Sequence, residues 1–442
     1  MKITDFLNNN YSDSALYINF RAMPSYIDGL KNSGRKCLYT IKKKNPKTEI
    51  KVSNFAGSII DESNYLHGNT SMEGTIVTLS QNYCGSNNIP ILEGVGSFGT
   101  RFCPEPAAPR YIFVKPMPYL DELFKKEDEV NLIEQEFEGD KIEPMYYVPT
   151  LPMLLVNGST GIGVGFASTV LSRSTANMIK AIKAKLDGKK LSKDLFVPHW
   201  NGFTGQIKLL EGNKWEIRGL ATIDDKKVTI TELPISFSLI KYVDELKKLK
   251  EKGLILKYID FSDDDKFKFE VTLSPEEAKK DQEQIFKDLK LIDTISENLV
   301  CIDENNAIKE YESAADIFND YFKIKVKYLE KRIKSEVKRL SDEELALKET
   351  VKFIKEVIKG TINLKLKKSE VEKVLKEKKY VNIEKLLAMP LYSITEDKAK
   401  ELEKKWKDKI AELEKMKVET PENLWKNDIS ELESKLKKAN LL

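Results

Sequence analysis

Histidine is nearly absent from this chain, which contains two histidines among its 442 residues. A zinc site or a Ser-His-Asp triad would need nearly all of them in one place, and the sequence contexts of His67 and His199 differ. The sequence therefore gives poor support to hydrolase and zinc-protease chemistry.

Cysteine and long apolar runs are scarce as well. The four cysteines have neither metal-ligand spacing nor the density of a disulfide scaffold, which suits a reducing cytosol. No apolar stretch reaches the ~18 residues that a membrane span needs, and the first ten residues, MKITDFLNNN, lack a signal-peptide core. We therefore expect a cytoplasmic protein with no membrane partner.

Nucleotide-binding motifs are also missing, although two glycine-rich stretches come close. Residues 94–99 match GxGxxG, but three prolines follow within ten residues, so the segment cannot open the helix that a dinucleotide site requires. Residues 158–165 lack the Lys-Ser/Thr ending of a P-loop. No ATP site is predicted in this chain.

Charged residues (32%) and hydrophobic residues (41%) are present in proportions typical of a globular and rather helical protein. The length predicts roughly two to four domains, because it is too great for one compact core. The net charge of +3 does not by itself indicate nucleic-acid binding. Eight basic residues nevertheless lie between positions 31 and 51. They could form a surface that binds nucleic acid, or a basic loop exposed to solvent. They are Lys31, Arg35, Lys36, Lys42, Lys43, Lys44, Lys47 and Lys51.

A helix is predicted from Thr70, where residues 70–73 have the sequence of a capping box. Its apolar side has helical spacing, and Gly85 is a plausible stop. The opposite side is polar and uncharged, as in a helix that lies in a DNA groove, although ordinary surface helices look the same. The apolar residues are Met72, Ile76, Leu79 and Tyr83.

Further along, short strands alternate with helices over residues 150–295. Residues 256–261 and 267–273 predict a hairpin, and the Asp263 and Asp265 pair between them is more typical of a solvated turn than of a metal site. A short helix is also predicted near residues 13–19, before Pro24.

Two apolar seams with alternating four–three spacing predict an antiparallel coiled-coil arm. The first seam is interrupted at Glu344, the second has Lys409 as its polar member, and the segment between them, with Pro390, predicts a small helical head. The first seam comprises Ile333, Val337, Leu340, Leu347, Val351, Ile354 and Ile358; the second comprises Ala399, Leu402, Trp406, Leu413 and Met416.

Several motifs in a fixed order carry a family resemblance. The segments YLHG (65–68), GSNNIPILEGVGSFGTR (85–101) followed by Arg110-Tyr111, and LLVNGSTGIGVG (154–165) resemble the DNA-cleaving core of the type IIA DNA topoisomerases, the breakage-rejoining or A-type half. Weaker matches extend the resemblance almost end to end, at residues 21–31, 35–39, 231–234, 259–263, 386–390 and 424–425. In compactness the chain most resembles the separate medium subunit of the T-even phage enzymes.

The resemblance implies an α+β fold in four parts. These are an N-terminal arm (1–30), a winged-helix DNA-cleaving domain (31–150), a tower-like α/β domain (151–300), and a coiled-coil arm (301–442) whose helical C-gate head, about 360–395, dimerises.

The resemblance also implies the chemistry. Tyr111 would form a transient 5′-phosphotyrosyl bond in each strand, so that a second duplex can pass, while a half-buried strand tyrosine is the alternative. Arg110 would hold a phosphate with its planar donors. Because neighbouring side chains of an extended segment point to opposite faces, we expect Arg110 to serve the other protomer's site or the adjacent phosphate. His67 and Arg21 match family residues near the reacting phosphate.

Ile162 matches the family's wedge, which enters a base step and bends DNA; a buried core isoleucine is the alternative. Basic and polar residues of other motifs are expected to contact DNA. The full set of expected DNA-binding residues is Lys31, Arg35, Lys36, Lys51, Asn69, Thr70, Ser71, Arg101, Ile162 and Thr204.

The expected partners are double-stranded DNA, a second copy of the chain and a separate ATPase/toprim subunit. That subunit would bind ATP and supply the Mg²⁺ ligands, with no metal held by this chain. A phage-encoded protein would work in the host cytoplasm or nucleoid. The end at Leu442 speaks against gyrase-type supercoiling. The alternative function is a non-catalytic winged-helix DNA-binding or architectural dimer.

Overall fold

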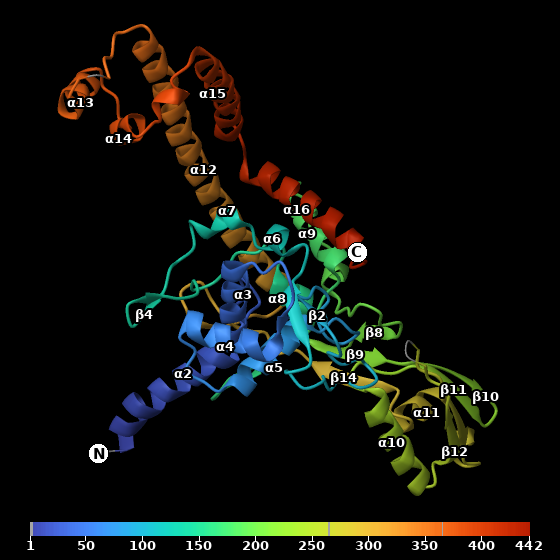
Figure 1. The fold of residues 1–442 in the computed structure, drawn as a ribbon. Coiled ribbons are helices and arrows are strands. Elements are labelled where there is room, and N and C mark those ends of the chain that lie inside the picture. The colour runs from blue at the N-terminus through green and yellow to red at the C-terminus, as the bar shows by residue number, and fades with distance from the viewer. Residues whose placement is uncertain (1–2, 264–265, 365) are drawn as a thin grey trace. The chain divides into compact units, whose positions relative to one another are not determined.

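The computed structural model describes residues 3–263, 266–364 and 366–442. The chain forms two compact units, one comprising Met1–Lys325 with Lys426–Leu442 and the other Val326–Trp425. Helices α12 (Ala314–Ile358) and α16 (Pro421–Lys438) each contribute to both units (Figure 1). The sequence prediction of a mixed α and β fold is confirmed.

The first unit begins with a helical arm made of α1 (Ile3–Asp5), η1 (Phe6–Tyr11) and α2 (Ser12–Ala22). The helix predicted near residues 13–19 lies within α2 and ends before Pro24, as expected. Asn19 is the one buried residue of α2, so the polar side chain must have a specific partner there.

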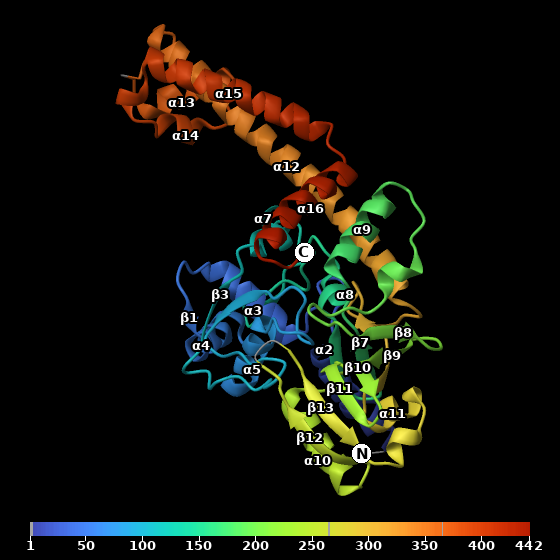
Figure 2. The same cartoon turned by 90° about the vertical axis from the view of Figure 1, so that its right-hand side faces the viewer.

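Three helices and a small sheet follow the arm. The helices are α3 (Asn32–Lys44), α4 (Val52–Ser63) and α5 (Asn69–Ser80). The sheet has the antiparallel order β1 (Ile50–Lys51), β3 (Phe113–Pro116), β2 (Leu92–Val95). Figure 2 shows the three helices beside this sheet. Apolar side chains at helical spacing, such as Leu38, Phe55 and Ile76, are fully buried.

Helix α5 has ends that differ from the prediction. Gly68, not Thr70, is its N-cap, and no side chain caps it, so the capping box is not formed. The Ser71 N–H donates to the Gly68 carbonyl at 3.1 Å, which starts the helix earlier and places Thr70 inside the first turn. At the other end Gln81 is extended, so the helix stops before Gly85, whose positive φ serves the following turn instead.

A four-stranded antiparallel sheet forms the next layer, with the order β10 (Leu220–Asp224), β11 (Lys227–Glu232), β13 (Phe269–Leu273), β12 (Ile255–Asp260). The predicted hairpin at residues 256–273 is confirmed by the β12–β13 pairing. Asp263 bridges Lys266 in its turn, while Asp265 lies outside the described residues. Alternate residues of β11 and β13 bury one face of the sheet under α10 (Leu239–Glu251) and α11 (Gln282–Asp288).

Smaller elements complete the first unit. They are α6 (Leu120–Leu123), α7 (Lys126–Glu129), β4 (Glu136–Phe137), β5 (Asp140–Lys141), α8 (Met153–Asn157), β6 (Ser159–Ile162), β7 (Ala167–Val170), α9 (Thr175–Leu186), η2 (Lys193–Phe196), β8 (Gln206–Leu209), β9 (Lys214–Arg218), η3 (Glu277–Lys279), β14 (Ile292–Ser296), β15 (Val300–Ile302) and β16 (Ile308–Glu310). Strands β14, β9 and β8 form a third antiparallel sheet, and β6–β7 forms a hairpin.

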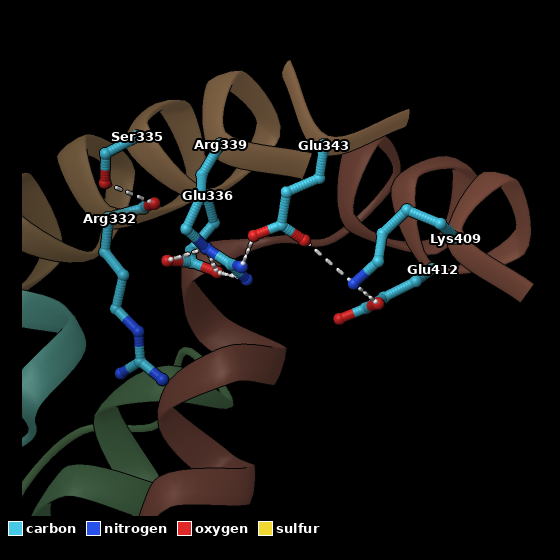
Figure 3. Close-up of polar contacts among 7 residues, drawn as sticks. All are labelled: Arg332, Ser335, Glu336, Arg339, Glu343, Lys409 and Glu412. Atoms are coloured by element: carbon cyan, nitrogen blue, oxygen red, sulfur yellow. Dashed lines mark hydrogen bonds and ion pairs between the residues drawn. The ribbon is translucent and has the colours of Figure 1, made fainter. Parts of the chain in front are cut away.

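The second unit pairs α12 with α15 (Glu396–Lys417) in antiparallel fashion. The polar interruption of each predicted seam has a partner on the other helix. Trp406 Nε1 donates to Glu344 Oε1 at 2.6 Å. Lys409 Nζ lies 3.0 Å from Glu343 Oε2 (Figure 3). These contacts give the break at Glu344 and the polar Lys409 a structural reason.

Between these helices lie α13 (Lys368–Glu377), α14 (Ile383–Leu387) and η4 (Leu391–Ser393). They close over a small apolar core with the end of α12. Its buried residues are Phe353, Ile362, Val371, Leu375, Tyr380 and Leu386. None of the helices described in either unit is long and apolar enough to cross a bilayer.

Candidate functional site

Tyr111 lies in a turn just before β3. Its N–H donates to the Ala108 carbonyl at 2.9 Å, and the start of α4 fixes the turn, where the Val52 N–H donates to the Ile112 carbonyl at 3.0 Å. The Tyr111 side chain is 65% exposed. It is therefore not a half-buried strand tyrosine, and its hydroxyl is open to a reactant.

Arg110 lies beside Tyr111, not on the opposite face. The guanidinium carbon is 4.9 Å from the centroid of the Tyr111 ring, a cation–π contact. The expectation of opposite faces is wrong because this segment turns and is not extended. One protomer can therefore present the cation and the phenol together to a single phosphate.

His67 belongs to a second cluster, between α2 and α5. Its Nε2 lies 2.8 Å from the Tyr17 hydroxyl, and the Arg21 guanidinium stacks on the Tyr17 ring at 5.6 Å. The Tyr65 ring meets the imidazole edge-to-face at 5.3 Å. Desolvation, followed by the positive charge of Arg21, lowers the pKa of His67 below its usual value.

The structure brings His67 and Arg21 together, and separately Arg110 and Tyr111. Among the residues that the structure describes, no hydrogen bond or ion pair links one pair to the other. Each pair is fixed by its own elements, α2 with the α4–α5 connection for the first and the α4–β3 contact for the second.

Ile162 ends strand β6, close to the tip of the β6–β7 hairpin, and is 87% exposed. A buried core position therefore does not explain it. Asn19 of α2 holds the tip through Val164, and there is no room for a side chain at Gly163, where a Cβ atom would lie 2.1 Å from Asn19 Oδ1. Close approach of α2 thus explains this glycine of the motif.

Arg35 and Lys36 are buried, so the expectation that they contact DNA is corrected. Arg35 forms a two-pronged pair with Asp28, with Nε 2.8 Å from Oδ2 and Nη2 3.1 Å from Oδ1. Lys36 Nζ donates to Glu143 at 2.8 Å and to the Ser63 carbonyl at 2.6 Å. Burial of a charge requires such partners, which leaves neither cation available to a phosphate.

Other members of the basic cluster are also paired. Lys42 lies 2.9 Å from Glu129, while Lys43 and Lys44 both pair with Glu62. Among the described residues, the cluster members without a carboxylate partner are Lys31, Lys47 and Lys51. Burial lowers the pKa of Lys31, whose Nζ lies near the Ile162 hairpin, 3.6 Å from where a Cβ on Gly161 would be.

Arg101 and Thr204 share one partner, Glu232, which is 4% exposed. Arg101 Nη1 lies 2.6 Å from Glu232 Oε1, and Thr204 Oγ1 donates to Oε2 at 2.8 Å. Arg101 also donates to the Leu233 carbonyl at 2.7 Å. The expected DNA contact of Arg101 is corrected to a structural role, and the Thr204 hydroxyl is already used.

Asn69, Thr70 and Ser71 occupy the exposed first turn of α5. Ser71 Oγ accepts from the Tyr65 hydroxyl at 3.2 Å, so the turn is tied to the residues around His67. The N–H groups of a first turn lack helical partners, which suits them to a phosphate oxygen. This part of the predicted DNA surface is open.

Tyr17, Asn19 and Glu232 organise these clusters and were not singled out from the sequence. Their partners lie 50, 145 and 131 residues away in the chain, at His67, Val164 and Arg101, so no local pattern reveals these contacts. Two signals were available: Tyr17 and Arg21 are four residues apart and so are neighbours on a helix, and Glu232 lies within the matched residues 231–234.

Magnesium does not fit the described residues taken alone. No group of three or more His, Cys, Asp or Glu side chains in the described ranges could hold a metal ion. The carboxylates near the clusters, such as Asp28 and Glu143, are engaged by buried cations. No chemical step is therefore assigned to a metal held by this chain.

Comparison with known proteins gives a consistent result. The family model for the A-type subunit of DNA gyrase/topoisomerase IV matches residues 21–430. The chain is 31% identical over 366 residues to the mitochondrial DNA topoisomerase 2 of Dictyostelium discoideum, covering 81% of this chain and 28% of that protein. It is 32% identical over 388 residues to the mouse DNA topoisomerase 2-alpha, covering 85% of this chain and 25% of the relative.

A solved structure extends the match. The DNA-binding, cleavage and re-ligation domain of Plasmodium falciparum topoisomerase II superposes with a TM-score of 0.89 and 31% identity, covering 98% of this chain and 64% of that one. The chain thus spans about a quarter of the length of these curated relatives. With residues 21–430 matched by the family model, this chain belongs to the A-type family of DNA gyrase and topoisomerase IV, within the type IIA topoisomerases.

Proposed function

We propose that the chain is the DNA-cleaving and rejoining part of an ATP-dependent type IIA topoisomerase, with Tyr111 as the nucleophile. The exposed Tyr111, with the Arg110 guanidinium over its ring, carries this proposal. A phenol has a pKa of about 10 and is a weak nucleophile at neutral pH, and an adjacent cation stabilises both the phenolate and the phosphate that it attacks.

The proposed step is a transesterification. The Tyr111 Oη–phosphorus bond forms as the bond from phosphorus to the 3′ oxygen breaks. The phenol loses its proton and the 3′ oxygen gains one, which leaves a 5′-phosphotyrosyl ester and a free 3′-hydroxyl. Since one phosphate ester replaces another, resealing by the reverse reaction requires no separate energy source.

DNA would be held by those candidates that bind no carboxylate among the described residues. Ile162 would enter a base step as an apolar wedge, at a cost of a few kcal/mol of unstacking. Lys31, Lys51 and the first turn of α5 would bind the backbone, with His67 and Arg21 close to the reacting phosphate. The exposure of Ile162 supports the wedge, because an exposed β-branched side chain gains nothing from the protein core.

The larger assembly is part of the same proposal. Helices α3–α5 with the β1-β3-β2 sheet would be the winged-helix domain of residues 31–150, preceded by the arm (1–30) and followed by the tower domain (151–300). The coiled-coil arm (301–442) would dimerise through its C-gate head. A separate partner protein, as in the T-even phage enzymes, would bind ATP and supply the Mg²⁺ ligands.

The decisive experiment traps cleavage with denaturant, in the presence of the ATPase/toprim partner and Mg²⁺, and identifies the DNA-linked peptide. Tyr111→Phe should abolish the protein–DNA adduct, and Tyr11→Phe, at another exposed tyrosine, should leave it intact. An adduct formed by Tyr111→Phe would refute the assignment. DNA bending without any adduct in the wild type would favour the architectural alternative.

The chain alone should bind DNA without cleaving it efficiently. Lys31→Ala should weaken binding equally at all sequences, as expected for a lost phosphate contact. Ile162→Ala should reduce bending, measured by energy transfer between duplex ends, and shift the cleavage pattern, because pyrimidine–purine steps unstack most easily. Efficient ATP-dependent strand passage by the chain alone would contradict the need for a partner.

A further inference from the structure

Tyr17 is an exposed tyrosine with an organised environment. It lies on α2, its side chain is 51% exposed, and its hydroxyl reaches His67 Nε2 at 2.8 Å across 50 residues of sequence. The guanidinium of Arg21, one turn further along α2, lies over its ring, 5.6 Å from the centroid. Because Tyr17 is half exposed, packing does not fix the orientation of its side chain. The hydrogen bond to His67 and the contact with Arg21 fix it instead.

The imidazole of His67 is held on two sides. Tyr17 binds Nε2, and the Tyr65 ring meets the imidazole edge-to-face at 5.3 Å. The Tyr65 hydroxyl is directed to Ser71 at 3.2 Å and not to His67. Among the hydrogen bonds of the described residues, the bond to Tyr17 is therefore the one that distinguishes the two ring nitrogens of His67.

That distinction has a chemical consequence. Desolvation and the positive charge of Arg21 lower the pKa of His67 and so favour the neutral ring, and a neutral imidazole has one N–H donor and one acceptor. A phenol hydroxyl can donate to a ring nitrogen or accept from it, and the direction of this bond sets the tautomer. In the arrangement in which the Tyr17 O–H donates to Nε2, the proton lies on Nδ1.

We propose that Tyr17 is a positioning residue that fixes His67 in the Nδ1–H tautomer, so that Nδ1–H is the donor presented to a DNA phosphate oxygen. This inference rests on the proposed function for the identity of the acceptor. The tautomer itself does not depend on it. A ring fixed in orientation and tautomer donates to the phosphate without first having to reorganise.

The chain suits a direct test, because it has two histidines and His199 lies in a different region. Long-range ¹H–¹⁵N spectra of histidine-labelled protein at pH 7.5, without DNA, should show His67 protonated on Nδ1. Tyr17→Phe keeps the ring and removes the hydroxyl, and should convert His67 to a mixture of tautomers. Tyr65→Phe is the matched control, because it removes a neighbouring hydroxyl that does not bind His67, and should leave the tautomer unchanged.

Cleavage measurements complete the test. Tyr17→Phe should slow adduct formation about tenfold or more at unchanged DNA affinity, since misplacing a catalytic group affects the rate more than binding. An Nε2–H tautomer in the wild type, or the same single tautomer in Tyr17→Phe, would overturn the inference. Absence of any cleavage in the wild type would instead count against the proposed function and leave the tautomer result standing.

Discussion

Asn19 binds both backbone polar groups of Val164. The Asn19 side-chain oxygen accepts from the Val164 N–H at 2.7 Å, and its amide nitrogen donates to the Val164 carbonyl at 3.1 Å. The buried Asn19 side chain thus makes the two backbone hydrogen bonds that a neighbouring strand would otherwise make. It does so at the tip of the β6–β7 hairpin, next to Ile162. The proposed wedge is rigid because α2 holds it.

Replacing Asn19 should loosen this hairpin. Asn19→Ala removes two hydrogen bonds and should cost about 2–3 kcal/mol of unfolding free energy, at roughly 1 kcal/mol per bond plus the desolvation of groups left unpaired. Asn19→Asp retains the acceptor but sets a carboxylate against the Val164 carbonyl, and should be at least as damaging. Amide exchange of Val164 and denaturant unfolding measure both effects; unchanged Val164 protection in Asn19→Ala would contradict the role given to Asn19.

Gly161 should not tolerate even a methyl group. A Cβ atom there would lie 2.1 Å from the Ala22 carbonyl oxygen, which is backbone and cannot rotate away. Gly161→Ala should therefore lower stability by about 1–3 kcal/mol and reduce DNA bending by displacing the hairpin. Gly57→Ala on α4, where a Cβ meets nothing within 4 Å, is the control and should raise stability by about 0.5–1 kcal/mol. Equal melting temperatures for the two variants would rule out the close approach.

Removing the positive charge of Arg21 should change the pKa of His67. Its positive charge disfavours protonation, so Arg21→Gln should raise the pKa of His67 toward its usual value, while the desolvation contribution remains. Because the folded pKa is depressed, His67 contributes stability that is full above about pH 6.5 and declines as pH falls toward the folded pKa. Histidine NMR titration measures the shift. The His199 signal, whose pKa is lowered by its own burial, should not move.

Replacing Arg101 should lower the stability of the fold, and this effect should be the primary one rather than a loss of DNA binding. Removing its charge leaves Glu232 buried and unpaired, so Arg101→Ala should cost about 3–5 kcal/mol. Thr204→Val removes one hydrogen bond to the same carboxylate and should cost about 1 kcal/mol. Chemical denaturation gives both values. Normal stability together with weakened DNA binding in Arg101→Ala would restore Arg101 as a DNA contact.

Much of the fold could be predicted from periodicity. The β12–β13 hairpin, the end of α2 before Pro24, and the pairing of α12 with α15 all follow from local patterns of apolar residues and turn formers. The start of α5 could not be predicted, because Thr70 and Glu73 satisfy the capping-box pattern while the structure places the cap at Gly68. A local motif shows which side chains could cap a helix. Packing with distant parts of the chain determines which residue becomes the cap.

At Arg110 and Tyr111 one motif contains both residues, but it did not reveal that the segment turns and places the two side chains together. The site was also not predictable where charges are neutralised across the fold. Arg35 and Asp28 are close in sequence, but the partner of Lys36, Glu143, is 107 residues away. From the sequence alone, every lysine is a cation that could bind DNA. The fold shows which lysines already form an ion pair with a carboxylate.

This neutralisation bears on the thermodynamics of DNA association. Five of the eight cations of residues 31–51 pair with four carboxylates, because Lys43 and Lys44 share Glu62, so four positive charges are not balanced within the described part of the chain. Only a cation that neutralises a phosphate displaces the counter-ions condensed on the duplex. In a plot of the logarithm of affinity against the logarithm of salt concentration, this segment should thus contribute a slope of about −4, where the bare count of eight would give about −7. Half of the positive charge of the basic segment is therefore neutralised within the protein. Only the remaining cations can replace the counter-ions that surround DNA.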